Sequence, residues 1–289
     1  MQSHLKGLMI TTLGVLFIVP DSLFVRLIDA EPLVISFWRG LTTGLFVLAF
    51  VLLYQGPKGF SALRRSGWSG ATYAVLLAST TPAFVLAVAN TSVANVVFIF
   101  ASTPIFAAIF SRVFLGEPIR LRMVLTIVVV AIGLAIIAYG SGGSRVSSWK
   151  GDLLALYVSA AYAAALTAVR NVRDVSMIPA IPVAYLGSAA VVGLFVSPVP
   201  AFVAQWPLFI GHGVFIGLAS CLLTLGPRYI SSAEVSVLIL LESVLAPILA
   251  WKVVGENPGR HAIVGGALVV GAILVSNLYL VLVKGDGDA

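Results

Sequence analysis

The chain has 289 residues, of which 60% are hydrophobic and only 10% are charged. Soluble domains carry a charge at about a quarter of their positions, so this composition excludes a soluble protein and indicates an integral membrane protein. The net charge of +6 is scattered over the ends of apolar segments. That distribution argues against nucleic acid as a partner and fits orientation in a lipid bilayer.

The apolar segments are continuous and about 20 residues long, as membrane-spanning helices require, whereas membrane β-strands alternate apolar and polar residues. The first segment lacks an A-x-A cleavage site, which indicates a retained helix rather than a signal peptide. The prolines and Trp206 of segment 197–207 suggest an interfacial loop. The pattern predicts an all-α membrane protein with ten transmembrane helices, at 8–28, 33–54, 68–88, 94–115, 121–140, 151–171, 180–196, 208–226, 233–253 and 262–283.

Ten spans place both termini on one side of the membrane. That side would hold eleven of the Lys and Arg residues and the opposite side six. Because positive residues are enriched in cytoplasmic loops, the termini are predicted to be cytoplasmic.

An internal repeat divides the chain. A set of residues of the first half recurs 139 residues later in the chain. A weaker match at an offset of 144 pairs Gly7 with Gly151 and Arg26 with Arg170. Residues 1–143 and 144–289 are therefore predicted to form two five-helix repeats, and because five is odd the second is inverted. Inverted repeats are typical of secondary transporters, which bind substrate between the halves. The recurring residues include Ser92, Ala94, Val96, Gly116 and Glu117, which return as Ser231, Ala233, Val235, Gly255 and Glu256.

Glu242 lies near the middle of span 233–253 and is the deepest carboxylate of the sequence. An ionised carboxylate at that depth costs at least about 2.5 kcal/mol, so the side chain should face protein or a water-filled cavity. There it could load and release protons. The alternative is a neutral side chain that bonds to Ser243 or to a neighbouring helix and contributes only to packing.

Polar residues also occur in the spans of the first repeat. In span 94–115, Asn95, Ile99, Ser102 and Phe106 form one stripe, which suits either a cavity wall or a contact between helices. Pro82 follows Ser79 and Thr80, and such interrupted helices can expose backbone groups to a ligand. Asp21 is predicted to form a salt bridge to Arg26 or Arg39 rather than to bind a ligand.

Aromatic residues and hydroxyls of other spans are further candidates. Tyr157, Tyr162, Phe98 and Trp38 could stack on an aromatic substrate or a cation, or could face lipid. Ser220 and Thr224 could line the same space or bond to their own backbone. The candidate substrate-binding residues are thus Asn95, Phe98, Ile99, Ser102, Ser79, Thr80, Tyr157, Tyr162, Ser220 and Glu242.

Other residues are assigned to structure. Glu117 and Glu256 each follow a glycine at a junction between spans, which predicts turn-building roles. Gly133 and Gly265 favour a close approach of spans 121–140 and 262–283, or a contact between two copies of the chain. His4, His212 and His261 lie near different span ends, and no catalytic or metal-ligand motif occurs. No enzyme activity, cofactor or metal is therefore expected.

Three local motifs carry a resemblance to a known family. They are FWRG (Phe37 to Gly40), GEP after the fourth span (Gly116 to Pro118) and GENP after the ninth (Gly255 to Pro258). With ten spans in two repeats, the chain resembles the EamA type of the drug/metabolite transporter superfamily, and within it the bacterial inner-membrane exporters of aromatic amino acids. The resemblance implies export of amino acids, with organic cations as an alternative substrate class.

These observations together predict a secondary transporter that works by alternating access. A central cavity would be formed by the first, third, fourth, sixth, eighth and ninth spans, and the halves would rock about hinges near four prolines. Protons are a candidate coupling ion, and the oligomeric state is left open. A lipid-modifying enzyme and a membrane subunit without transport activity are the alternatives from other classes. The four prolines are Pro20, Pro82, Pro104 and Pro247.

Overall fold

The computed structural model describes residues 2–116, 121–141, 147–170, 175–225, 229 and 232–285. Every element within these ranges is a helix, which confirms the all-α prediction. A short 3-10 helix, η1 (Pro57–Phe60), precedes α4. The α-helices are α1 (Gln2–Ile18), α2 (Asp21–Leu27), α3 (Pro32–Tyr54), α4 (Ser61–Asn90), α5 (Val93–Phe100), α6 (Thr103–Leu115), α7 (Leu121–Ser141), α8 (Trp149–Arg170), α9 (Ala180–Val192), α10 (Val199–Leu225), α11 (Ser232–Val254) and α12 (Arg260–Gly285).

These helices account for the ten predicted spans. Seven of the described helical segments are long and apolar enough to cross a membrane, and the segments 180–192 and 260–276 are shorter apolar helices. Two spans consist of two helices each, because the first is divided into α1 and α2 and the fourth into α5 and α6. The protein is therefore a multi-pass membrane protein with helix breaks inside two of its spans.

The prolines of the spans differ in their effect. Pro20 precedes α2 and Pro104 is the second residue of α6, so both stand at breaks. Pro82 and Pro247 lie inside the continuous helices α4 and α11. Of the four predicted hinge positions, only the first two coincide with an interruption of a helix.

Segment 197–207 is not the interfacial loop that the sequence suggested. Residues from Val199 onward are helical and belong to α10, which has a local break at Gln205, two residues before Pro207. Prolines are tolerated in the first turn of a helix, where the missing N–H has no partner in any case. The two prolines at the start of this segment therefore allowed a helix to begin.

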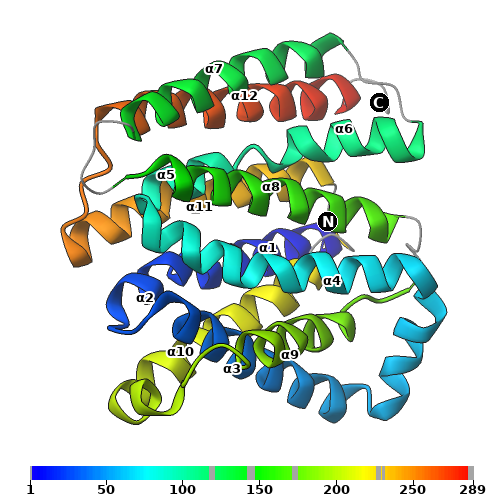
Figure 1. The fold of residues 1–289 in the computed structure, drawn as a ribbon. Helices are drawn as coiled ribbons and strands as arrows, with labels where there is room; N and C mark the ends of the chain where they lie inside the picture. The colour runs from blue at the N-terminus through cyan, green and yellow to red at the C-terminus, as the bar shows by residue number, and fades with distance from the viewer. Residues whose placement is uncertain are drawn as a thin grey trace.

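The most extensive helix pairings join the two repeats. Helix α4 packs along α8, α7 along α12, and α3 along both α9 and α10. Figure 1 shows α7 and α12 side by side at one edge of the bundle and α3, α9 and α10 at the opposite edge. The repeats are thus interleaved rather than separate bodies, and buried residues from both form the core.

The contact between α7 and α12 depends on two glycines. A Cβ atom on Gly265 would lie 2.5 Å from the backbone oxygen of Gly133, and one on Gly133 would lie 2.7 Å from the backbone oxygen of Gly265. Backbone atoms cannot move aside as a flexible side chain can. The prediction that these two spans pack together is therefore confirmed.

We expect Gly265→Ala to lower the free energy of unfolding by about 1–3 kcal/mol, because the added methyl group overpacks the α7–α12 contact. Unfolding of the purified protein in detergent measures the effect. Gly271→Ala is the matched control on the same helix, since a Cβ atom there meets nothing within 4 Å. Equal stability of the two variants would contradict the close-approach model.

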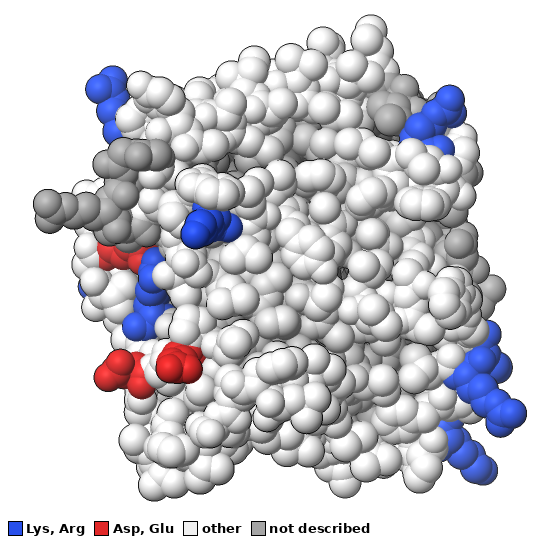
Figure 2. Space-filling view, in the orientation of Figure 1, with Lys and Arg blue, Asp and Glu red and all other residues white. Residues whose placement is uncertain are grey.

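Charged residues differ between the two ends of the bundle. Lys58, Arg64 and Arg65 are exposed in η1 and at the start of α4. Asp29 and Glu31 are exposed at the opposite end, between α2 and α3. Figure 2 shows Lys and Arg at both edges of the bundle, whereas the visible Asp and Glu lie only toward the edge opposite the one at which α12 ends.

Candidate functional site

A buried ion pair connects the first two spans. Arg39 of α3 donates from Nε to Oδ1 of Asp21 at 3.0 Å and from an Nη atom to Oδ2 at 2.6 Å. The two side chains are only 7% and 4% exposed. The predicted salt bridge of Asp21 is therefore confirmed, with Arg39 and not Arg26 as its partner.

His212 of α10 is the third member of this cluster. Its Nε2 lies 2.6 Å from Oδ1 of Asp21, and its side chain is fully buried. An ionised carboxylate can only accept hydrogen bonds, so Nε2 carries the hydrogen. Nδ1 has no hydrogen-bond partner among the described residues. The cluster therefore combines one anion, one cation and one imidazole nitrogen that is free to take up a proton.

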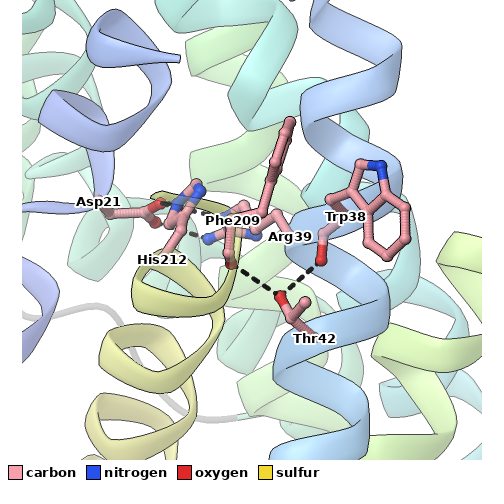
Figure 3. Close-up of polar contacts among 6 residues, drawn as sticks. All are labelled: Asp21, Trp38, Arg39, Thr42, Phe209 and His212. Carbon is pink, nitrogen blue, oxygen red and sulfur yellow. Dashed lines mark hydrogen bonds and ion pairs between the residues drawn. The ribbon is translucent and has the colours of Figure 1, made fainter. Parts of the chain in front are cut away.

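The cluster is held in place by the packing of α3 on α10. The hydroxyl of Thr42 donates to the carbonyl of Trp38 at 2.6 Å and lies 3.2 Å from the carbonyl of Phe209 (Figure 3). Gly213 permits this approach, because a Cβ atom there would clash with the Thr42 side chain. Arg39 and His212 are thereby brought to the same level on neighbouring helices, and Asp21 meets them at the first residue of α2.

Aromatic rings surround the charged atoms. Phe24 stacks on the His212 ring with centroids 5.1 Å apart, and the guanidinium carbon of Arg39 lies 5.4 Å from the Phe84 ring and 5.8 Å from the Tyr185 ring. Cation–π contacts of this kind stabilise a guanidinium that is removed from water. Rings of two different helices, α4 and α9, therefore help to keep Arg39 charged inside the bundle.

Glu242 of α11 is buried, with 6% of its side chain exposed. Helix α11 packs against α1, α2, α5 and α12. The alternative contact with Ser243 is not formed by the serine hydroxyl, which donates to the carbonyl of Val97 at 3.4 Å. Glu242 is thus a buried residue of a helix that packs against α2, the helix that begins with Asp21.

The break between α5 and α6 is stabilised by hydroxyl groups. Pro104 has no N–H, so the carbonyl of Phe100 loses its usual partner one turn later. The Thr103 hydroxyl donates to that carbonyl instead, and Ser102 donates to the carbonyl of Ile99 at 2.6 Å. Ser159 of α8 lies 3.0 Å and 3.2 Å from these two hydroxyls. Backbone groups at membrane depth are satisfied here by side chains of both repeats.

A second polar network lies where α4, α5, α7 and α8 meet. Asp152, near the start of α8, accepts at Oδ1 from Thr91 at 2.7 Å and from Asn95 at 3.1 Å, and at Oδ2 from Ser141. All four side chains are buried. The donors come from the first repeat and the acceptor from the second, so the network ties the repeats together at one end of the bundle.

Glu256 makes another connection at this end. Its Oε2 lies 2.7 Å from Nε of Arg26, and its Oε1 accepts from the backbone N–H of Val93 in the first turn of α5. Arg26 also donates to the carbonyl of Thr91 at 2.8 Å. The predicted turn is present, because Gly255 follows the last residue of α11 with a positive φ of 71°. Glu256 is therefore more than the turn-building residue that the sequence suggested, whereas Glu117 lies outside the described residues.

We expect Glu256→Gln to speed amide hydrogen exchange in the first turn of α5 by about tenfold or more, because charge-assisted hydrogen bonds are worth about 1.5–3 kcal/mol. Mass spectrometry of peptides that cover residues 91–97 measures the effect. Glu31→Gln, at an exposed position of the same end, serves as the control and should leave this exchange unchanged. Unchanged exchange in Glu256→Gln would show that the contact does not hold α5.

The remaining predicted residues lie in several places. Asn95 and Ser102 belong to the two polar networks above, Ile99 is in the hydrophobic core, and the Phe98 ring packs where α12 has Gly266. Tyr157 is 46% exposed and donates to Ser79 at 2.8 Å. The other contacts are those of Thr80 with the carbonyl of Leu77, of Tyr162 with the Phe100 ring, and of Thr224 with the carbonyl of Ser220.

Two grooves lie among the described residues, and one of them includes a predicted site residue. One, of about 400 Å³, lies between α4 and α9 and includes Ser79, Pro82 and Gly187. The other, of about 340 Å³, follows α1. Neither includes Glu242 or Arg39, so the central cavity around Glu242 stays a prediction.

Two buried residues of these clusters, His212 and Asp152, were not predicted from the sequence. His212 was placed near a span end because the eighth span was thought to begin at residue 208, but α10 begins at Val199. Asp152 was overlooked because an acid in the first turn of a helix usually interacts with the helix dipole. The signal that could have found His212 is that ionisable residues inside membrane spans mark functional sites by default.

A multi-pass helical bundle of two interleaved repeats, with buried charged residues from both, has the architecture of a secondary transporter. The model of the EamA-like transporter family matches residues 5–139 and 149–278, and the chain belongs to this family of membrane transporters, which are generally not enzymes. A solved structure described as "Crystal structure of protein" is similar, with a TM-score of 0.65 at 19% sequence identity over 95% of this chain and 97% of that one. That likeness shows the fold alone. Comparison with curated proteins gives no match.

Proposed function

We propose that this transporter exports small amphipathic metabolites, in particular amino acids, including aromatic ones. The observation that supports amino acids is the presence of both signs of charge in the buried cluster. Arg39 offers a guanidinium to a carboxylate, while Asp21 and Glu242 offer carboxylates to an ammonium group. A zwitterion needs both kinds of partner, whereas an organic cation needs only the negative one.

Alternating access is supported by how the two repeats share the buried groups. Asp21 and Arg39 belong to the first repeat, and His212 and Glu242 belong to the second. The networks around Asp152 and Glu256 join the repeats at one end of the bundle through hydrogen bonds and an ion pair, which can break and form again. A relative motion of the repeats would thus change the surroundings of the cluster and the closure of that end together.

We further propose that the chain lies in a bacterial inner membrane with both termini in the cytoplasm. The exposed residues Lys58, Arg64 and Arg65 near the start of α4 support this orientation. Enzyme reporters that work on only one side of the membrane, fused after Ala289, test it. Activity of a reporter that requires the periplasm would reverse the assignment.

The test of the proposed function is uptake of labelled tryptophan and threonine into liposomes that contain the purified protein, with and without a pH gradient. We expect saturable flux of both amino acids. Arg39→Lys should reduce that flux about tenfold, because lysine keeps the charge but loses the two-pronged geometry of the guanidinium. Arg64→Lys, at an exposed position, is the matched control and should transport normally.

A labelled organic cation is measured in parallel. Flux of the cation without flux of either amino acid would move the substrate class to organic cations. Absence of flux for every solute, in protein that unfolds cooperatively, would contradict the proposed substrate classes.

A further inference from the structure

A groove of about 400 Å³ lies between α4 and α9, two apolar helices of the membrane-spanning bundle. Its lining contains no charged residue. The groove is open at Gly187, where a Cβ atom would meet nothing within 4 Å. Val75 and Val191, which also line it, are 68% and 60% exposed, so the groove faces the outside of the bundle. In a membrane this outer surface meets lipid, and an apolar groove there favours a hydrocarbon occupant.

The groove lies at the depth of the acyl chains. Its residues on α4 run from Ala74 to Pro82, which is about 12 Å at about 1.5 Å per residue. It begins about 9 Å beyond Trp68, the residue that follows the local break of α4 at Gly67. The headgroup region of one leaflet is about 5–7 Å thick and its hydrocarbon about 15 Å. With Trp68 at the level of the headgroups, the groove therefore extends through most of one hydrocarbon leaflet.

Trp68 has the exposure and the direction expected at this level. Its side chain is 86% exposed, and tryptophan is enriched where a bilayer meets water. Val75 follows it by seven residues and Ser79 by eleven, which places all three on one face of α4. A side chain suited to the interface thus stands at one end of the groove, on the same face of the helix.

Three basic residues lie beyond Trp68. Lys58 of η1 and Arg64 and Arg65 of α4 are exposed, and Figure 2 shows Lys and Arg projecting at the edge of the bundle where α4 begins. None of the three forms an ion pair with another described residue. The helices η1, α3, α4 and α9 contain no acidic residue. This edge therefore offers positive charge to an anion from outside the protein.

Helix α9 begins at the same edge (Figure 1). Met177, just before α9, and Ala180, its first residue, share a buried cluster with Tyr73, which precedes the first groove residue of α4. Both walls of the groove therefore start from the basic edge.

We propose that the groove between α4 and α9 binds an acyl chain of an anionic phospholipid, whose phosphate lies against Lys58, Arg64 and Arg65. Along α4 the basic residues come first, then an exposed tryptophan and then the apolar groove, which is the order of headgroup, interface and chain in a lipid. Clusters of Lys and Arg at the membrane surface attract anionic lipids. The groove includes neither Arg39 nor His212, so the proposal does not rest on the proposed function.

The first experiment tests the headgroup. Native mass spectrometry of the delipidated protein, titrated with phosphatidylglycerol or with phosphatidylcholine of identical chains, measures lipid binding. We expect phosphatidylglycerol to bind about tenfold more tightly. The double variant Arg64→Gln with Arg65→Gln should lose this preference, whereas Lys252→Gln with Arg260→Gln, at exposed positions of the opposite end, should keep it. Equal binding of the two lipids to the wild-type protein would overturn the proposal.

The second experiment tests the chain. In Gly187→Leu the added side chain extends into open space, so the variant is expected to fold, and thermal unfolding checks this. It should bind phosphatidylglycerol about tenfold more weakly, because the side chain takes the place of the lipid chain in the groove. Gly271→Leu, at an open position of α12, is the matched control and should bind like the wild-type protein. Unchanged binding in Gly187→Leu would overturn the proposal.

The same variant distinguishes two other occupants. If Gly187→Leu abolished amino-acid flux in liposomes but left lipid binding unchanged, the groove would belong to the transported solute. If it turned a dimer into a monomer and left lipid binding unchanged, the groove would be a contact between copies of the chain. Either result would overturn the lipid site.

Discussion

Replacing Asp21 by asparagine is expected to lower the free energy of unfolding by about 3–5 kcal/mol. The carboxylate accepts two hydrogen bonds from Arg39 and lies 2.6 Å from Nε2 of His212. An amide can accept a hydrogen bond but cannot balance a positive charge. Because Arg39 is only 6% exposed, its charge would stay buried without a counter-ion. Unfolding of the purified variant in detergent measures the loss.

Two further variants identify the cause of this loss. Asp29→Asn changes an exposed carboxylate just beyond α2 and should alter stability by about 0.5 kcal/mol or less. The double variant Asp21→Asn with Arg39→Gln should recover most of the stability, because no unpaired charge remains. A double variant as unstable as Asp21→Asn would show that the ion pair is not the source of the loss.

Replacing Asp152 by alanine is expected to lower the free energy of unfolding by about 3 kcal/mol or more. Three buried donors, on Thr91, Asn95 and Ser141, would lose a charged acceptor at once. Since all three lie in the first repeat, the substitution should also loosen the two repeats at this end. Hydrogen exchange in the first turns of α5 and α8, together with unfolding in detergent, measures both effects.

Two control variants accompany Asp152→Ala. One keeps the shape of the Asp152 side chain, and the other changes an exposed residue in the same helical turn. Asp152→Asn retains one acceptor oxygen and should lose less stability than the alanine variant. Lys150→Ala changes an exposed residue in the same turn of α8 and should have little effect. If Lys150→Ala and Asp152→Ala lowered the free energy of unfolding by similar amounts, the buried network would not be what stabilises the protein.

The fold could be predicted from the sequence to a large extent because the bilayer imposes a simple rule of length and polarity. All the predicted spans have helical counterparts, and the α7–α12 contact followed from glycines on two spans that match each other in the repeat. The error in segment 197–207 came from treating prolines as loop residues. The same residues also suit the first turn of a helix, and sequence alone does not distinguish the two.

The site could be predicted less completely, because its contacts join distant parts of the chain. A salt bridge of Asp21 to Arg26 or Arg39 was predicted, but the sequence did not decide between the two partners. His212 meets Asp21 across 191 residues, and Asp152 meets Asn95 across 57. Local periodicity carries no information about such contacts. They depend on how α3 packs on α10 and how α4 and α5 pack on α8.

The two spans that are divided into two separate helices both belong to the first repeat, whereas α8 and α11, at the equivalent positions of the second, are single helices. At the repeat offsets, Pro20 and Pro104 correspond to Ala164 and Ser243, which can both continue a helix. Since the duplication, the two copies have therefore become specialised. A homodimer of the first copy would have every break twice but neither His212 nor Glu242, and a homodimer of the second would lack Asp21 and Arg39. Neither half could therefore form a symmetric dimer that contains all four of these residues, so the full set requires both copies in one chain.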